Sequence, residues 1–189
     1  MLPKINIYYS YIYDKAVHTL TGKKYNKECV KGGNKFASML EKGSANILPK
    51  ALKSYEEVSG LRWKDPFIEV FVVHGIPWDF SWPVTIKVRE NKKDAVETLI
   101  HELGHQLLIQ NEEIIRSRNG IITKYGKENQ IVKDHILLHA VLWKLYSKLF
   151  GEHELHNIII GYQKWKYHYR AWQIVKKEGA DKIIDAYIM

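Results

Sequence analysis

The sequence is poor in cysteine and has no long apolar run, and both absences narrow what the protein can be. Its 189 residues include one cysteine, Cys29. The chain therefore cannot form an internal disulfide or a cysteine-rich zinc site, and a metal would have to be held by histidine, aspartate or glutamate. The apolar runs are too short to cross a bilayer, and the N-terminus lacks the pattern of a signal peptide. We expect a cytoplasmic protein without a membrane partner.

The composition is that of a folded protein with a basic surface. Hydrophobic residues make up 46% of the chain and charged residues 26%, and the formal net charge is +8. These fractions are typical of soluble globular proteins. A basic surface can attract nucleic acid, but a lysine-rich surface is more often only a solvated face. We therefore do not expect nucleic acid as the partner.

Hydrophobic patterning predicts strands and helices in the first half of the chain. The strands alternate apolar and polar residues or are β-branched throughout, and Pro49 suits the first turn of a helix. The segment 84–90 alternates strictly, as a half-exposed strand does. The predicted elements are a strand at 5–13, two helical pieces within 33–59, a strand at 67–73, a loop at 74–83 and the strand at 84–90.

The second half is predicted to be helical. A helix begins at Lys93 and runs through residue 110, followed by a polar connector at 116–129. The next helix, 130–150, is apolar nearly all round, so we expect it to be buried, and Gly151 to end it. A further helix is predicted for 154–178 and a short one at the C-terminus. The sequence contains no repeat and no clear linker.

The stretch HELGH places two histidines and a glutamate on the first of these helices. Residues four apart share a helix face, so His101 and His105 can direct both imidazoles at one metal ion. Glu102 follows the first histidine and is suited to take a proton from a zinc-bound water. Glu102 is the only charged residue between positions 98 and 110. Burying three polar groups in such a helix requires partners, which a metal provides; hydrogen-bonded core histidines are the alternative.

The stretch TLIHELGHQL resembles the zinc-binding helix of the zincin metallopeptidases. The strand, loop and strand before it are similar to the N-terminal half of zincin catalytic domains, and the resemblance covers about residues 67–150. It implies an α+β fold with a small mixed sheet of about three to four strands packed on the zinc helix, followed by long helices. It also implies peptide hydrolysis with one zinc ion per chain and Glu102 as general base. The pattern is closest to small gluzincin-like peptidases (minigluzincins).

The third zinc ligand is harder to assign, since catalytic zinc usually has three protein ligands. Position 111 is Asn, so the metzincin pattern is absent. Gluzincins take a glutamate from a later helix, and here the later helix carries DHILLHA. By analogy of position His135 is the predicted third ligand, and His139 supports it or is itself the ligand. Glu128 is a further candidate, although its surroundings are turn-like.

Two other motifs are expected to be structural. The second HEL, with His153 and His156, follows Gly151 at a polar helix start and is typical of a surface helix. The aromatic-basic stretch at 162–172 repeats at helical spacing, which favours a core-facing stripe with the cations in solvent. Residues near the zinc could also stabilise an oxyanion. The candidate donors are Tyr146 and His168, with Tyr167, Tyr169 and His74 as further alternatives.

These observations predict a single zincin-like domain over residues 1–189. Residues 1–92 would supply the N-terminal strand, backing helices and sheet, residues 93–150 the zinc-site helices, and residues 151–189 the C-terminal helices. The leading hypothesis is a zinc metallopeptidase acting on a peptide or protein, which would pair with the strand 84–90 or its neighbour. The alternatives are a silent or latent zincin-fold binding protein, and a basic nucleic-acid-binding protein.

Overall fold

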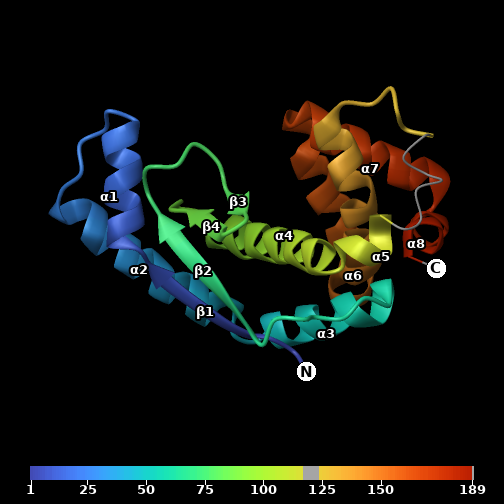
Figure 1. Ribbon diagram of the computed structural model, residues 1–189, viewed down its shortest axis with the longest axis horizontal. Helices are drawn as coiled ribbons and strands as arrows, with labels where there is room; N and C mark the ends of the chain where they lie inside the picture. Colours follow the sequence, from blue (N-terminus) through green and yellow to red (C-terminus); the bar gives the residue numbers. More distant parts are fainter. Residues whose placement is uncertain (117–123, 189) are drawn as a thin grey trace. The chain divides into compact units, whose positions relative to one another are not determined.

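The structure of the chain, a computed structural model, describes residues 1–116 and 124–188 (Figure 1). It divides into two compact units. Unit 1 comprises Met1–Pro49 and Trp63–Gln106, and unit 2 comprises Lys50–Arg62 and Leu107–Met189. The described residues form eight α-helices and a mixed four-stranded sheet. An α+β fold with a small mixed sheet is therefore confirmed. No described helix has the length and apolar character needed to cross a membrane.

Unit 1 holds the sheet and the N-terminal helices. The strands are ordered β1-β2-β4-β3; β1, β2 and β4 run parallel, and β3 is antiparallel to β4. The inward side chains of β2 and β4, such as Val70, Val72 and Ile86, are fully buried. The elements of this unit are β1 (Lys4–Tyr9), α1 (Tyr11–Leu20), α2 (Lys27–Ser44), β2 (Phe67–Val73), β3 (Phe80–Ser81), β4 (Val84–Lys87) and most of α4 (Lys92–Gln110).

Two expectations for unit 1 are wrong. The strand predicted for 5–13 ends at Tyr9, because the Ser10 side chain accepts a hydrogen bond from the Tyr13 backbone N–H at 3.4 Å and caps α1. The strand β4 is not half-exposed, because it lies between β2 and β3 and Thr85 is as buried as Val84 and Ile86. The Thr85 hydroxyl donates a hydrogen bond to the Pro83 carbonyl. A strand with neighbours on both sides offers no edge for a peptide, whereas β3 lies at an edge of the sheet.

Unit 2 is helical, as predicted for the second half of the chain. Its core contains the inward residues of α6, including Val132, Leu138 and Leu145, together with residues of α7 and α8. Pro49 is the second residue of α3, as expected from its fixed φ angle. The elements are α3 (Leu48–Ser59), whose first residues belong to unit 1, α5 (Glu112–Arg116), α6 (Gln130–Gly161), the short 3-10 helix η1 (Tyr162–Lys164), α7 (Lys166–Glu178) and α8 (Ala180–Ile188).

The predicted helix breaks in unit 2 are shifted. Gly151 does not end α6 but interrupts it, with φ 81° and ψ 168°, and the helix resumes to Gly161. The chain breaks instead at Trp165, between η1 and α7, so a continuous helix at 154–178 is wrong. The break leaves Trp165 57% exposed, whereas Trp172 is 1% exposed. The core-facing stripe therefore holds for Trp172 but not for Trp165. Most of the connector predicted at 116–129 lies outside the described residues.

Candidate metal centre

In unit 1, α4 presents the HELGH motif on a buried helix. Asn91 caps this helix, because its side-chain oxygen accepts from the backbone N–H groups of Lys93 and Asp94 at 3.0 and 3.4 Å. The helix begins and ends within one residue of the prediction. His101 is 4% exposed and His105 is half-buried, and their ring centroids lie 5.0 Å apart. The two imidazoles therefore share one helix face, as their spacing predicts.

Glu102 has the electrostatics of a proton-transfer group. It is 9% exposed, and its pKa is raised to about 8, mainly by burial and also by the charge of Asp79. The charge of Arg89 and a hydrogen bond with Ser81 oppose this increase. A carboxyl group whose pKa lies near neutrality can accept and return a proton at physiological pH. A bound cation beside it would favour the charged carboxylate again.

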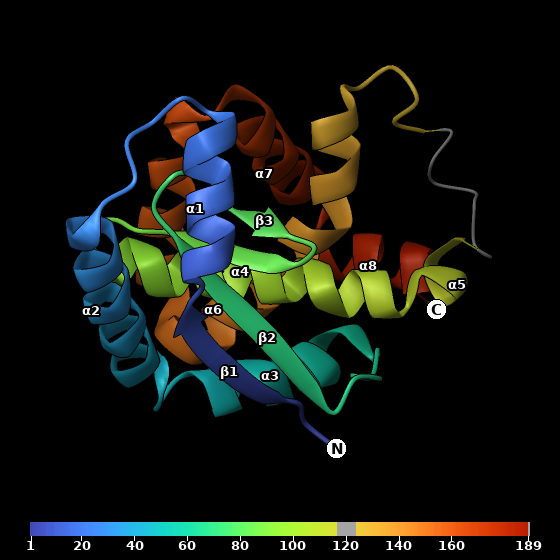
Figure 2. The same ribbon diagram turned by 60° about the vertical axis from the view of Figure 1, so that its left-hand side comes forward.

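An ion pair and a short strand surround Glu102. Arg89 pairs with Asp79 and donates to the Thr98 hydroxyl of α4 at 2.9 Å, while Asp79 also accepts from the Lys87 backbone N–H at 2.7 Å. The Gln106 side chain donates to the Ser81 carbonyl of β3. These contacts hold the part of α4 that belongs to unit 1 beside the sheet edge, where the helix runs along β4 and β3 (Figure 2). The motif helix is thus held to β3, an edge strand of the sheet.

Unit 2 contains a second group of histidines, which we call the α6–α7 cluster. It consists of His135 and His139 on α6 and His168 on α7, and one ring nitrogen of each lies within 4.8 Å of the others. The ring centroids of His135 and His168 are 4.1 Å apart, and those of His135 and His139 are 5.3 Å apart. His139 is completely buried and His135 is 8% exposed. Three imidazoles at this separation can ligate one ion.

Hydrogen bonding and stacking orient two members of the α6–α7 cluster. The His135 Nδ1 atom lies 2.6 Å from the Ile131 carbonyl oxygen. A carbonyl only accepts, so Nδ1 carries the proton and the lone pair of the neutral ring is on Nε2. A backbone carbonyl on the second nitrogen is how metal-binding histidines are commonly oriented. His139 instead stacks on Trp172, with centroids 4.2 Å apart and planes 16° apart.

The third member, His168, is kept neutral. Its pKa is lowered to about 4, mainly by burial and also by the charge of His135. Zinc binds the neutral imidazole, so a low pKa removes proton competition at physiological pH. The sequence suggested His168 only as an oxyanion donor. Its contact with His135 makes it equally a candidate ligand. The residues of the α6–α7 cluster therefore fit a borderline-soft cation such as Zn²⁺.

Other predicted residues have contacts of their own. Tyr146 is buried on α6, with its ring 5.8 Å from that of Phe150. Glu128 accepts hydrogen bonds from the Arg170 guanidinium at 2.6 and 3.1 Å, so its carboxylate already has a cationic partner. The second HEL is at the surface, where His153 and His156 are exposed, as expected. The ion pair of Asp79 and Arg89 had no sequence signal, because it joins a loop to the end of a strand.

Comparison with known proteins gives no assignment. The chain matches no family model, no curated protein and no solved structure.

Proposed function

We propose that the chain is a cytoplasmic zinc-dependent peptidase of the zincin type. In this proposal His101, His105 and His135 hold one zinc ion, and Glu102 is the general base. His139 is the alternative third ligand or supports it. The observation that carries the proposal is Glu102, a buried carboxyl group with a pKa near neutrality that directly follows His101 on the motif helix.

The donor set agrees with zinc. All proposed ligands are imidazoles, and the proposed ligand His135 carries its proton on the nitrogen that faces the Ile131 carbonyl. Imidazole nitrogen suits zinc better than it suits magnesium or calcium, which prefer oxygen. His135 is preferred to His139 because its carbonyl contact leaves the Nε2 lone pair of the neutral ring for a metal.

The side chains of unit 1 define the chemistry. Zinc, when bound, would act as a Lewis acid that activates water and polarises the peptide carbonyl. Glu102 would accept the proton that the water loses and deliver it to the amine that leaves. Arg89, paired with Asp79, would keep an opposing charge near Glu102 as its protonation changes. Gln106 would hold β3 beside the motif helix, where an extended peptide could pair with the strand edge.

The test of this proposal is Glu102→Gln, which keeps the shape of the side chain and removes its basicity. Zinc content and cleavage of casein and a peptide library are measured on the same sample. Retained zinc with lost cleavage supports the proposal. Retained zinc with undiminished cleavage contradicts Glu102 as the base.

The α6–α7 cluster supports a second candidate, a non-catalytic metal-binding protein. Its three imidazoles come from one compact unit, so they could hold an ion without α4. A site closed by protein ligands would be structural. In that case zinc would survive His101→Ala, would be lost with His168→Ala, and no peptide would be cleaved by the wild-type chain.

A further inference from the structure

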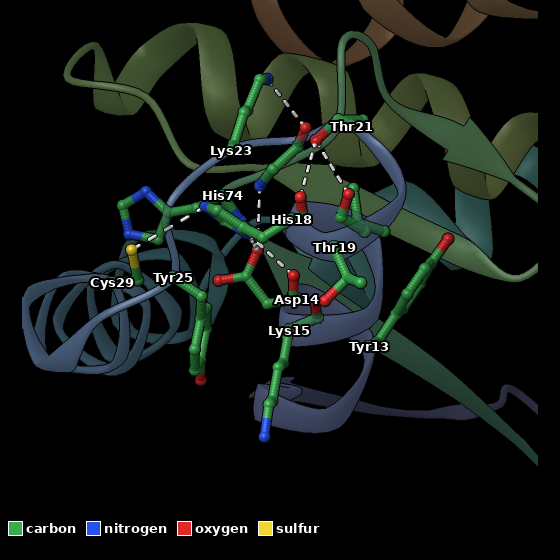
Figure 3. A network of polar contacts seen from close by, with 12 residues as sticks. Tyr13, Asp14, Lys15, His18, Thr19, Thr21, Lys23, Tyr25, Cys29 and His74 are labelled. Carbon is green, nitrogen blue, oxygen red and sulfur yellow. Dashed lines mark hydrogen bonds and ion pairs between the residues drawn. The ribbon is translucent and has the colours of Figure 1, made fainter.

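A second cluster of reactive groups lies in unit 1, around the chain's single cysteine (Figure 3). The Cys29 sulfur is 3.8 Å from Nε2 of His18. On the other side of this ring, Nδ1 lies 2.8 Å from the Asp14 carbonyl oxygen and 3.1 Å from its carboxylate. A thiol, an imidazole and a carboxylate thus stand in series, the order found in activated nucleophiles.

The hydrogen bonds of His18 fix which nitrogen faces the sulfur as a base. Both neighbours of Nδ1 are oxygen acceptors of Asp14, and the carbonyl cannot donate. Nδ1 therefore carries the proton, and in the neutral ring Nε2 presents its lone pair to Cys29. The ring is 5% exposed, so solvent competes little for this nitrogen.

Hydrogen bonds to both carboxylate oxygens fix the position of Asp14. It is completely buried, and one carboxylate oxygen accepts from the backbone N–H groups of His74 and Gly75 at 2.8 and 2.9 Å. The other accepts from the Tyr9 hydroxyl at 2.7 Å. A Cβ at Gly75 would lie 2.7 Å from His18 Nδ1, so the close approach of the loop to the ring requires glycine here.

Cys29 is accessible to solvent and lies where the helix dipole favours negative charge. It is partly exposed and lies in the first turn of α2, where Asn26 caps the helix. The N-terminus of a helix stabilises negative charge, which suits a thiolate. A further sign of a ligand is His74: its Nε2 is buried and has no hydrogen-bond partner among the described residues. This atom borders α2 at Gly32, one turn beyond Cys29.

We propose that Cys29, His18 and Asp14 form a reactive-thiol site that exchanges with low-molecular-weight disulfides. His18 Nε2 takes the thiol proton and the sulfur attacks one sulfur of the disulfide. A new S–S bond forms, the old one breaks, and the departing thiolate takes the proton from His18. The disulfide is the oxidant, and the products are a mixed disulfide on Cys29 and one free thiol. Because the chain has no second cysteine, only an external thiol can reverse the modification.

The test is the rate at which the wild-type protein reacts with dithiobis(nitrobenzoate) at neutral pH, in the native state and in denaturant. A free thiol is only a few per cent ionised at this pH, so the native state should react at least about tenfold faster than the unfolded chain. Mass spectrometry should show one adduct. A native rate at or below the unfolded rate would overturn the proposal.

His18→Asn identifies the base, because asparagine keeps a donor towards Asp14 and removes Nε2. The native rate should fall at least about tenfold, while the matched control Glu28→Gln, at the exposed neighbour of Cys29, should change it less than about twofold. Equal losses in both variants would refute a specific role of His18. If His18→Asn does not fold, the ratio of the native to the unfolded reaction rate of the wild-type protein tests the proposal. Zinc binding at α4 plays no part in this site, so the outcome is independent of the peptidase proposal.

Discussion

The histidine pairs of α4 and α6 share a spacing of four residues and differ in their surroundings. Beside His101 and His105 stands Glu102, a carboxyl group with an ion pair nearby. Beside His135 and His139 stand an indole and a third imidazole. The α4 face carries a carboxyl group whose pKa suits proton transfer, whereas the α6–α7 cluster consists of imidazoles whose spacing suits a metal ion.

The largest expected effect is the loss of proton transfer on the α4 side. Glu102→Gln should lower kcat for peptide cleavage by about 10²–10⁴-fold, the usual contribution of a general base, with zinc content unchanged. Steady-state kinetics on a quenched fluorescent peptide, with metal analysis of each sample, measure this. Leu103→Met, a conservative change at the next position, should keep the rate within a few-fold. Equal rates in Glu102→Gln and wild type would mean that α4 carries no base.

The next effect falls on the packing of the α6–α7 cluster. Trp172 is almost fully buried against His139, so Trp172→Ala should lower the free energy of unfolding by about 3–5 kcal/mol. Trp165→Ala is the matched control: Trp165 is mainly exposed, and its loss should change stability by less than about 0.5 kcal/mol. Urea denaturation of both variants measures the difference. Similar values for the two would refute the packing of His139 on Trp172.

A smaller effect links pH to the buried carboxyl group of α4 in the metal-free protein. The pKa of Glu102 rises from 4.5 to about 8 on folding. As the pH rises, the unfolded chain releases this proton first. The protonated carboxyl group therefore makes its full contribution to the free energy of unfolding below pH 4.5, and this contribution is lost as the pH rises to about 8. The free energy of unfolding of metal-free Glu102→Gln, measured by urea denaturation, should equal that of wild type at pH 4 and exceed it by about 2–4 kcal/mol above pH 8. A difference that is constant with pH would contradict the raised pKa.

The smallest effect concerns the second HEL. His153 and His156 are exposed on the second part of α6, so His153→Ala should leave zinc content unchanged and shift stability by less than about 0.5 kcal/mol. Thermal unfolding and metal analysis suffice to measure this. Loss of zinc in this variant would instead assign the metal site to the surface of unit 2.

The sequence predicts those features that depend on short-range periodicity. The bounds of α4, the strand β2 and the place of Pro49 follow from local patterns. The contact of His168 with His135 does not, because the backbone leaves the helical path at Gly151 and again at Trp165. Each break resets the direction in which later side chains point. The burial of Thr85 likewise depends on strand order, which alternation cannot reveal.

The cluster around Cys29 was hidden for the same reason. Asp14 and His18 have helical spacing, but the alternating aromatic residues before them favour a strand through Tyr13, and only the Ser10 cap ends it. Cys29 and His74 then reach the cluster from α2 and from the loop after β2. Contacts between distant segments of this kind require the fold.

The central claim, that the α4 motif holds the zinc, is tested most directly by metal analysis of purified variants. The set is His101→Ala, His135→Ala, His168→Ala and the surface control His153→Ala, each checked for folding by circular dichroism. We expect one zinc per wild-type chain, retained in His153→Ala and lost in both His101→Ala and His135→Ala. Zinc that persists in His101→Ala but disappears with His135→Ala and His168→Ala would contradict it and assign the metal to the α6–α7 cluster alone.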